Sequence, residues 1–201
     1  MLSKLTNTIV PDEIMQDEIV QIADSTRLTY RLMGQNDAQA LWELDQDPKV
    51  MHFLNGGQPT PIETIKDIFL PRMKAYTDET KGWGIWKVSN KITQEYLGWV
   101  LVRPMDFFSD NPKLQDIEFG WRFFKKAWGK GYATEAAIMI KNAIVRQTNI
   151  AYLSALALED NYGSISVMKK VGMHFNKKYI HKDARGDLIA VHYQMSATSL
   201  A

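Results

Sequence analysis

The sequence predicts an α/β (α+β) fold in which helices flank a mixed central sheet of about six or seven strands. Two observations carry this prediction. An apolar run at 117–124 leads through a glycine-containing turn into a helix-like run at 133–145, and an apolar run at 150–158 follows. This order is typical of two parallel strands joined by a crossover helix. The alternating segments 82–88 and 96–102 predict an antiparallel hairpin in the same sheet.

Length and composition indicate one globular domain. The chain has 201 residues, of which 45% are hydrophobic and 23% are charged, and this is enough for one well-buried core. We expect residues 1–24 to form an N-terminal extension with a short helix after Pro11, and residues 25–201 to form the domain. The net charge of +1 argues against a nucleic-acid partner.

The chain has no cysteine, so it has no disulfide or thiolate metal site, and we expect no bound metal. Asp12, Glu13, Asp17 and Glu18 lie where a secretory signal needs an apolar core. No run reaches the roughly 20 apolar residues of a membrane span. These observations favour a cytoplasmic protein without a membrane partner.

The first half of the chain predicts one strand and two helices before the hairpin. Residues 26–32 alternate like a strand, and a capped helix is predicted over about 36–45. A turn-rich, loop-forming segment at 55–61 precedes a helix predicted over 62–77. This loop is a candidate boundary of the substrate site, since loops vary most freely.

The last third of the chain predicts one helix and two strands. Asn161 can cap a helix that Gly172 can end. Residues 175–180 and 188–195 then predict two strands joined by a polar hairpin.

The turn between the predicted strand 117–124 and the following helix is suited to an anion. Gly129 and Gly131 lack a Cβ, so a phosphate can approach the backbone closely. The first turn of the helix presents unpaired N–H groups and the positive end of its dipole. Basic residues surround this turn in the sequence, namely Arg122, Lys125, Lys126, Lys130, Lys141 and Arg146. The pattern predicts a site for a pyrophosphate group.

Two common phosphate motifs are excluded by position. A P-loop needs glycine where Phe124 stands and Ser or Thr where Gly131 stands. The dinucleotide-binding fingerprint needs a third glycine where Thr134 stands. Neither a P-loop ATPase nor a nucleotide-dependent dehydrogenase fits the sequence.

The run Lys126-Ala127-Trp128-Gly129-Lys130-Gly131 resembles the signature Arg/Gln-x-x-Gly-x-Gly/Ala of the GNAT (Gcn5-related) N-acetyltransferases. Lys126 departs from the usual Arg or Gln. The spacing Asn161-x-x-Ser164 resembles the second motif of the family, whose side chains contact coenzyme A. The resemblance covers about residues 26–195 and is greatest to the branch that contains the ribosomal-protein N-terminal acetyltransferases.

The resemblance implies acetyl-CoA as the acetyl donor and a primary amine as the acceptor, on a small molecule or a protein N-terminus. It also implies that the strand before the turn separates from its parallel neighbour and presents backbone N–H groups to the coenzyme. The coenzyme-binding residues implied are Phe119, Trp121, Phe123, Lys126, Ala127, Trp128, Gly129, Lys130, Gly131, Tyr132, Ala133, Asn161 and Ser164.

Glu118 is the candidate catalytic base, because strand alternation places it on the face opposite Phe119 and the family often carries an acid in this strand. Asp116 is the alternative on the same face. Many relatives carry a proton-donating Tyr seven residues after the motif Asn, where this chain has Met168, and methionine donates no proton. A lone histidine such as His52 is a weaker candidate.

Two other functional classes compete with the enzyme. A methionine in place of the family tyrosine at position 168 also fits a non-catalytic module that binds acyl-CoA and has a regulatory role. Nucleic-acid binding rests only on the basic cluster at 125–130 and is disfavoured by the near-neutral total charge. A homodimer through an exposed edge strand is compatible with the predicted fold.

Overall fold

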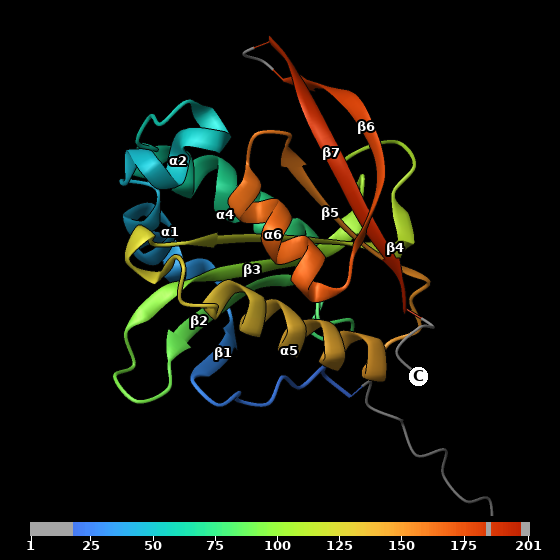
Figure 1. Ribbon diagram of the computed structural model, residues 1–201. Helices are drawn as coiled ribbons and strands as arrows, with labels where there is room; N and C mark the ends of the chain where they lie inside the picture. Colours follow the sequence, from blue (N-terminus) through green and yellow to red (C-terminus); the bar gives the residue numbers. More distant parts are fainter. Residues whose placement is uncertain (1–17, 184–185, 198–201) are drawn as a thin grey trace, which may run out of the picture.

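One mixed sheet organises the chain (Figure 1). The structure is a computed structural model that describes residues 18–183 and 186–197. Within these residues, seven strands lie in the order β1-β2-β3-β4-β5-β7-β6. The strands are β1 Leu28–Leu32, β2 Gly84–Asn90, β3 Tyr96–Met105, β4 Lys113–Phe123, β5 Tyr152–Leu158, β6 His174–Asp183 and β7 Gly186–Ser196.

The central neighbours β4 and β5 are parallel, whereas the other neighbours in the described sheet are antiparallel. Their pairing begins at Asp116 with Tyr152 and ends at Glu118 with Ser154. After Glu118, β4 pairs only with β3, and after Ser154, β5 pairs only with β7. The two strands therefore separate in the middle of the sheet, as the resemblance implied.

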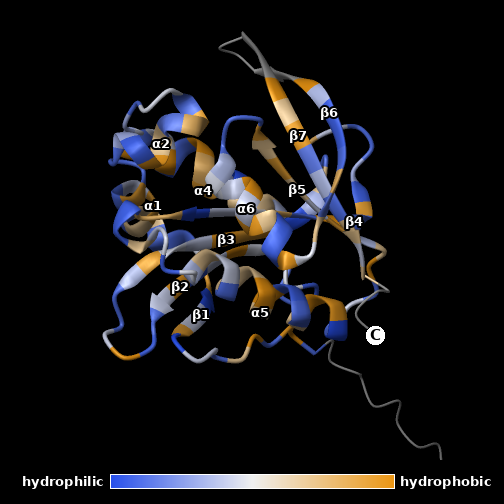
Figure 2. Cartoon of the chain, in the orientation of Figure 1, coloured by the Kyte–Doolittle hydropathy of each residue, from blue (hydrophilic) through white to orange (hydrophobic). Residues whose placement is uncertain are grey.

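Helices cover both faces of the sheet. Figure 1 shows α5 and α6 on one face, and α1, α2 and α4 on the other. Hydrophobic and hydrophilic residues alternate around α5 and α6 (Figure 2), as expected for helices that bury one side. The helices are α1 Ala38–Leu44, α2 Pro48–Asn55, α3 Ile62–Thr64, α4 Leu70–Tyr76, α5 Tyr132–Gln147 and α6 Tyr162–Val171.

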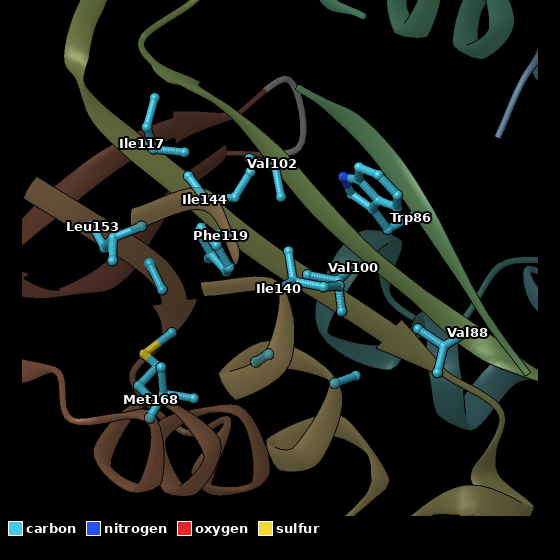
Figure 3. Close-up of a cluster of buried hydrophobic side chains, with 14 of the residues drawn as sticks. Trp86, Val88, Val100, Val102, Ile117, Phe119, Ile140, Ile144, Leu153 and Met168 are labelled. Carbon is cyan, nitrogen blue, oxygen red and sulfur yellow. The ribbon is translucent and has the colours of Figure 1, made fainter. Parts of the chain in front are cut away.

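Each face of the sheet has its own core. Ile140 of α5 and Met168 of α6 belong to the same buried cluster as Phe119 of β4 and Leu153 of β5 (Figure 3). A second cluster joins α1, α2 and α4 to the opposite face through residues such as Leu44, Met73 and Trp99. β2 and β3 therefore contribute side chains to both cores and connect the two helix layers.

Two local features differ from the sequence prediction. The helix α2 was not predicted, although Asp47 caps it by accepting a hydrogen bond from the N–H of Lys49, and Pro48 opens it. The helix predicted over 62–77 contains a π-helical turn at Ile65–Phe69, just before Pro71. Proline has no N–H to donate to the regular helical hydrogen bonds, and the helix beside it adopts the wider i→i+5 hydrogen bonding of a π-helix.

The segment before β1 packs on the domain. Val20 is buried in the main core and its N–H donates to the carbonyl of Glu79 at 2.9 Å. Gln21 and Gln147 exchange hydrogen bonds between this segment and the end of α5. The helix predicted after Pro11 falls mostly in residues 1–17, which lie outside the described residues, and residues 18–24 form neither helix nor strand.

Candidate functional site

A cavity of about 810 Å³ lies where β4 and β5 separate. Its walls come from the last residues of β4, the turn before α5, the end of β5 and the start of α6. Side chains from α1, α2 and α4 close the other side. One continuous space thus joins the predicted phosphate turn to the face of the sheet that carries Glu118.

The turn before α5 has the backbone geometry expected of an anion site. Gly129 and Gly131 have φ angles of +73° and +78°, which residues other than glycine adopt only with strain. An added Cβ at Gly129 would meet no atom within 4 Å, so conformation rather than space requires glycine there. Gly131 is the N-cap of α5, whose first-turn N–H groups have no intrahelical acceptor.

The start of α6 forms a second wall of the cavity. Asn161 caps the helix by accepting a hydrogen bond from the N–H of Ser164 at 3.1 Å, and Gly172 ends it with a φ of +101°. Both predicted caps are confirmed. Asn161 and Ser164 line the cavity as well, so they combine a structural role with a position suited to ligand contact.

Glu118 lies on β4 with its side chain turned into the cavity. Its Oε2 accepts a hydrogen bond from Nε of Arg103 at 2.8 Å, and the side chain is only 15% exposed. Asp116, the alternative base, does not line the cavity. Its two carboxylate oxygens accept hydrogen bonds from Ser154 Oγ at 2.7 Å and from Gln194 Nε2 at 2.9 Å. The geometry therefore favours Glu118.

Arg103, the partner of Glu118, lies close to two aromatic rings. Tyr76 of α4 is buried, and burial raises its pKa to about 12, so that its hydroxyl keeps its proton at neutral pH. The Arg103 guanidinium carbon lies 5.7 Å from the Tyr76 ring centre and 5.9 Å from that of Phe108. Arg72 lies 3.8 Å above Phe108.

The sequence prediction missed Tyr76, Arg72 and Arg103. Register explains the last of these, since Arg103 meets Glu118 only because β3 pairs with β4 in the observed alignment. The spacing of Tyr76 and Arg72 on a helix gave no signal of a cavity, because a core-facing aromatic and a surface arginine are ordinary on such a helix.

Arg122 forms a buried ion pair instead of a rim for phosphate. It pairs with Asp45, which also accepts a hydrogen bond from Thr60 Oγ1 at 3.0 Å. The pair joins β4 to the end of α1. Lys141, also expected near the turn, is buried and donates to the carbonyl of Val171 at 3.0 Å, and burial lowers its pKa. The basic cluster expected around the turn is therefore partly dispersed.

Comparison with known proteins identifies the family. The family described as "Acetyltransferase (GNAT) domain" matches residues 27–174, which contain the glycine turn, Glu118 and Asn161. The chain belongs to the GNAT acetyltransferase family. This GNAT chain is also 30% identical over 156 residues to the uncharacterized protein YkkB of Bacillus subtilis, an alignment that covers 75% of this chain and 84% of YkkB.

Solved structures share the GNAT fold. A GNAT acetyltransferase from Bacillus anthracis superposes with a TM-score of 0.70 at 20% identity, over 90% of this chain and 99% of that one. The ribosomal L7/L12 α-N-protein acetyltransferase RimL superposes with a TM-score of 0.68 at 14% identity, over 89% and 98% of the two chains. The predicted fold class is confirmed, and the chain is an N-acetyltransferase of this family.

Most of the coenzyme-binding residues predicted for this GNAT enzyme come together around the cavity. Eleven of them line it, namely Phe119, Trp121, Phe123, Ala127, Trp128, Gly129, Gly131, Tyr132, Ala133, Asn161 and Ser164. The side chains of Lys126 and Lys130 do not line it. Lys126 pairs with Glu95 at 2.6 Å, and the carbonyl of Lys130 accepts a hydrogen bond from Arg27. Lys170 of α6 lines the cavity in addition.

Met168, at the position of the family tyrosine, lies in the core. Its side chain is fully buried between α6 and the sheet (Figure 3) and does not line the cavity. His52 is exposed and also lies outside the lining. His192 is buried, with Nε2 2.8 Å from Ser154 Oγ.

The described part of the chain has no group of three or more His, Cys, Asp or Glu residues arranged to hold a metal ion. No helix within 18–183 or 186–197 has the length and apolar character needed to cross a membrane.

Proposed function

We propose that this GNAT enzyme uses acetyl-CoA to acetylate a primary amine, carried by a small molecule or by a protein N-terminus. One observation carries the proposal. The glycine turn, the unpaired edge of β4 and the carboxylate of Glu118 line a single cavity. The proposed sites for a phosphate-bearing donor and for an amine therefore share one space.

The residues present fit acetyl-CoA. Two glycines of positive φ and the first turn of α5 offer backbone N–H groups to the pyrophosphate. Alternate N–H groups of residues 119–123 that would face β5 in a closed sheet have no strand partner, and they suit the amides of the pantetheine arm. RimL, which shares the fold, was solved in complex with coenzyme A.

When bound, acetyl-CoA supplies an acetyl thioester whose carbonyl carbon the acceptor amine attacks directly, so that an N–C bond forms and the C–S bond breaks. Glu118 takes the proton that the amine must lose, directly or through water. Arg103 holds the Glu118 carboxylate through the 2.8 Å hydrogen bond. Backbone N–H groups of β4 orient and polarise the thioester carbonyl.

No side chain needs to replace the family tyrosine for the reaction to proceed. Thiols have pKa values near about 8.5, so a thiolate leaves readily without full protonation. We therefore assign most of the rate enhancement to positioning of the two reactants and to Glu118.

The proposal is tested by calorimetric titration of acetyl-CoA into the wild type and the Gly129→Asp/Gly131→Asp variant, followed by a thiol-release screen over amines. A carboxylate at either glycine adds negative charge where the pyrophosphate is expected. We expect binding by the wild type alone and thiol release with some amines. Absence of binding by folded wild type contradicts the proposal, and binding without release from any amine supports the non-catalytic module.

A further inference from the structure

The cavity lining has more basic than acidic side chains. In the described lining, the acidic residues are Asp45 and Glu118, and the basic residues are Arg72, Arg103, Arg122 and Lys170. Each acid is already paired, Asp45 with Arg122 and Glu118 with Arg103. Two positive charges remain, so the lining favours anionic groups and disfavours polycations.

The two remaining cations lie on different sides of the cavity. Lys170 is on α6, the helix that begins beside the predicted coenzyme contacts Asn161 and Ser164. We assign its charge to the phosphates of the proposed coenzyme. Arg72 is on α4, on the opposite layer of the molecule, with Tyr76 one helical turn further on. The charge of Arg72 therefore belongs to the acceptor side.

Arg72 and Arg103 converge on one aromatic ring. Their guanidinium carbons lie 3.8 and 5.9 Å from the centre of Phe108. Glu118 neutralises Arg103 at 2.8 Å, whereas no carboxylate of the described residues lies within ion-pair distance of Arg72. Arg103 is therefore paired with a protein carboxylate and Arg72 is not, and stacking on Phe108 orients the Arg72 guanidinium.

We propose that Arg72 binds a carboxylate of the acceptor, so that the substrate class is a small amine that also carries a carboxylate. The inference rests on the proposed acetyltransferase function. In this arrangement Glu118 receives the amine while Arg72 receives the carboxylate, and each end of the acceptor meets a group of opposite charge. A planar guanidinium suits a carboxylate because it donates two parallel hydrogen bonds. Polyamines, which add only positive charge, are poor acceptors.

The test uses acceptors in matched pairs, ω-amino acids of increasing length and n-alkylamines of equal length, with rates corrected for the neutral-amine fraction. For the best-fitting length we expect the wild type to show a kcat/KM about tenfold or more higher for the amino acid, the effect of one charge-assisted hydrogen bond. A second readout is calorimetric titration of the same pairs into enzyme saturated with coenzyme A, where the Kd should show the same preference.

Three variants assign the preference to Arg72. In Arg72→Gln we expect the ratio between pair members to fall to about twofold or less, because the charge is gone. Arg72→Lys should keep part of the preference through its charge. Lys74→Gln changes an exposed lysine on the same helix that does not line the cavity, and it should keep the wild-type ratio.

Each outcome supports or overturns the inference. A wild type that prefers the alkylamine or a polyamine, or a preference that survives in Arg72→Gln, overturns it while leaving the acetyltransferase intact. If folded enzyme binds acetyl-CoA but acetylates no member of any pair or other amine, the proposed function fails and this inference fails with it. If Arg72→Gln does not fold, the inference is decided by Arg72→Lys and by the wild-type preference for the amino acid over the alkylamine, measured both as kcat/KM and as Kd.

Discussion

Arg27 and Glu135 form an ion pair of 2.6 Å at the first turn of α5, although 108 residues separate them in the sequence. Glu135 also accepts hydrogen bonds from Ser25 Oγ at 2.7 Å and from the N–H of Arg27. Arg27 Nη1 donates to the carbonyl of Lys130 at 3.0 Å, and its guanidinium stacks on Tyr132. The segment before β1 thus holds the glycine turn from outside the cavity.

This contact predicts a role for Arg27 in coenzyme affinity. Arg27→Gln removes the ion pair and loosens the turn, so we expect the Kd for acetyl-CoA to rise about threefold to tenfold, measured by calorimetry. Lys91→Gln removes the exposed pair of Lys91 with Asp24 nearby and should leave the Kd unchanged. Equal effects of the two variants would mean that general surface charge, and not the held turn, governs affinity.

Backbone strain predicts the effect of a methyl group at Gly131. The φ of +78° is unfavourable for alanine, while the added Cβ would meet Arg27 only at 3.5 Å, an ordinary contact. Gly131→Ala should lower the free energy of unfolding by about 1–2 kcal/mol, measured by urea denaturation. Gly34→Ala is the control, because Gly34 has an extended backbone and open space around its Cβ. A similar loss in both variants would contradict the conformational explanation.

Catalysis by Glu118 predicts a large kinetic effect with a defined pH signature. Glu118→Gln should lower kcat about 10²-fold to 10⁴-fold, and the acidic limb of the kcat/KM profile should disappear. Binding of acetyl-CoA should stay close to wild type. In Asp116→Asn the profile should keep its shape, since Asp116 bonds to Ser154 and Gln194 away from the cavity. The assignment is wrong if the acidic limb persists in Glu118→Gln and is lost in Asp116→Asn.

Met168 is expected to act on stability rather than on turnover. Met168→Ala opens a space in a fully buried cluster and should cost about 2–5 kcal/mol of unfolding free energy. Met168→Leu conserves volume and should cost less than about 1.5 kcal/mol. Both should keep the wild-type kcat at a temperature where they are folded. Reduced kcat in Met168→Leu, with acetyl-CoA affinity intact, would show that the thioether takes part in the reaction.

His192 predicts a pH dependence of stability. Burial lowers its pKa below the ordinary value of 6.5, and nearby Lys177 and Lys113 lower it further, while Asp116 opposes them. The unfolded chain therefore takes up a proton at higher pH than the native state does. Stability should be greatest above about pH 6.5 and should fall as the pH decreases below that value. Urea denaturation between pH 5 and 8 should show a smaller fall in His192→Gln than in the wild type.

The glycine turn and the helix caps beside the cavity could be predicted because their signals are local. Gly129 and Gly131 follow a strand-like run and precede a helix-like one, so periodicity and glycine spacing suffice to locate the turn. Asn161 and Gly172 likewise mark their helix within a few residues. The ends of strands were harder to predict. β4 begins at Lys113, before the apolar run at 117–124, because Lys113 pairs with Met105 of β3.

The acceptor side depends on contacts that no short stretch of sequence contains. Arg103 reaches Glu118 through strand register. Arg122 was expected beside the phosphates because it is close to the turn in sequence, yet strand alternation turns it to the opposite face, where Asp45 pairs with it. The partner of a charged residue in a sheet is fixed by topology, so residue type and spacing could not distinguish a rim cation from a buried one.

Because β4 separates from β5, the stability of the folded protein should depend on the concentration of its ligand. Strands β1–β4 and β5–β7 are joined through the three residue pairs between Asp116–Glu118 and Tyr152–Ser154, and the proposed coenzyme lies where further pairs would be. A ligand at this seam stabilises the native state by mass action, by about 2.7 kcal/mol at a concentration of 100 Kd. The thermal stability of this enzyme should therefore rise and fall with the acetyl-CoA available to it.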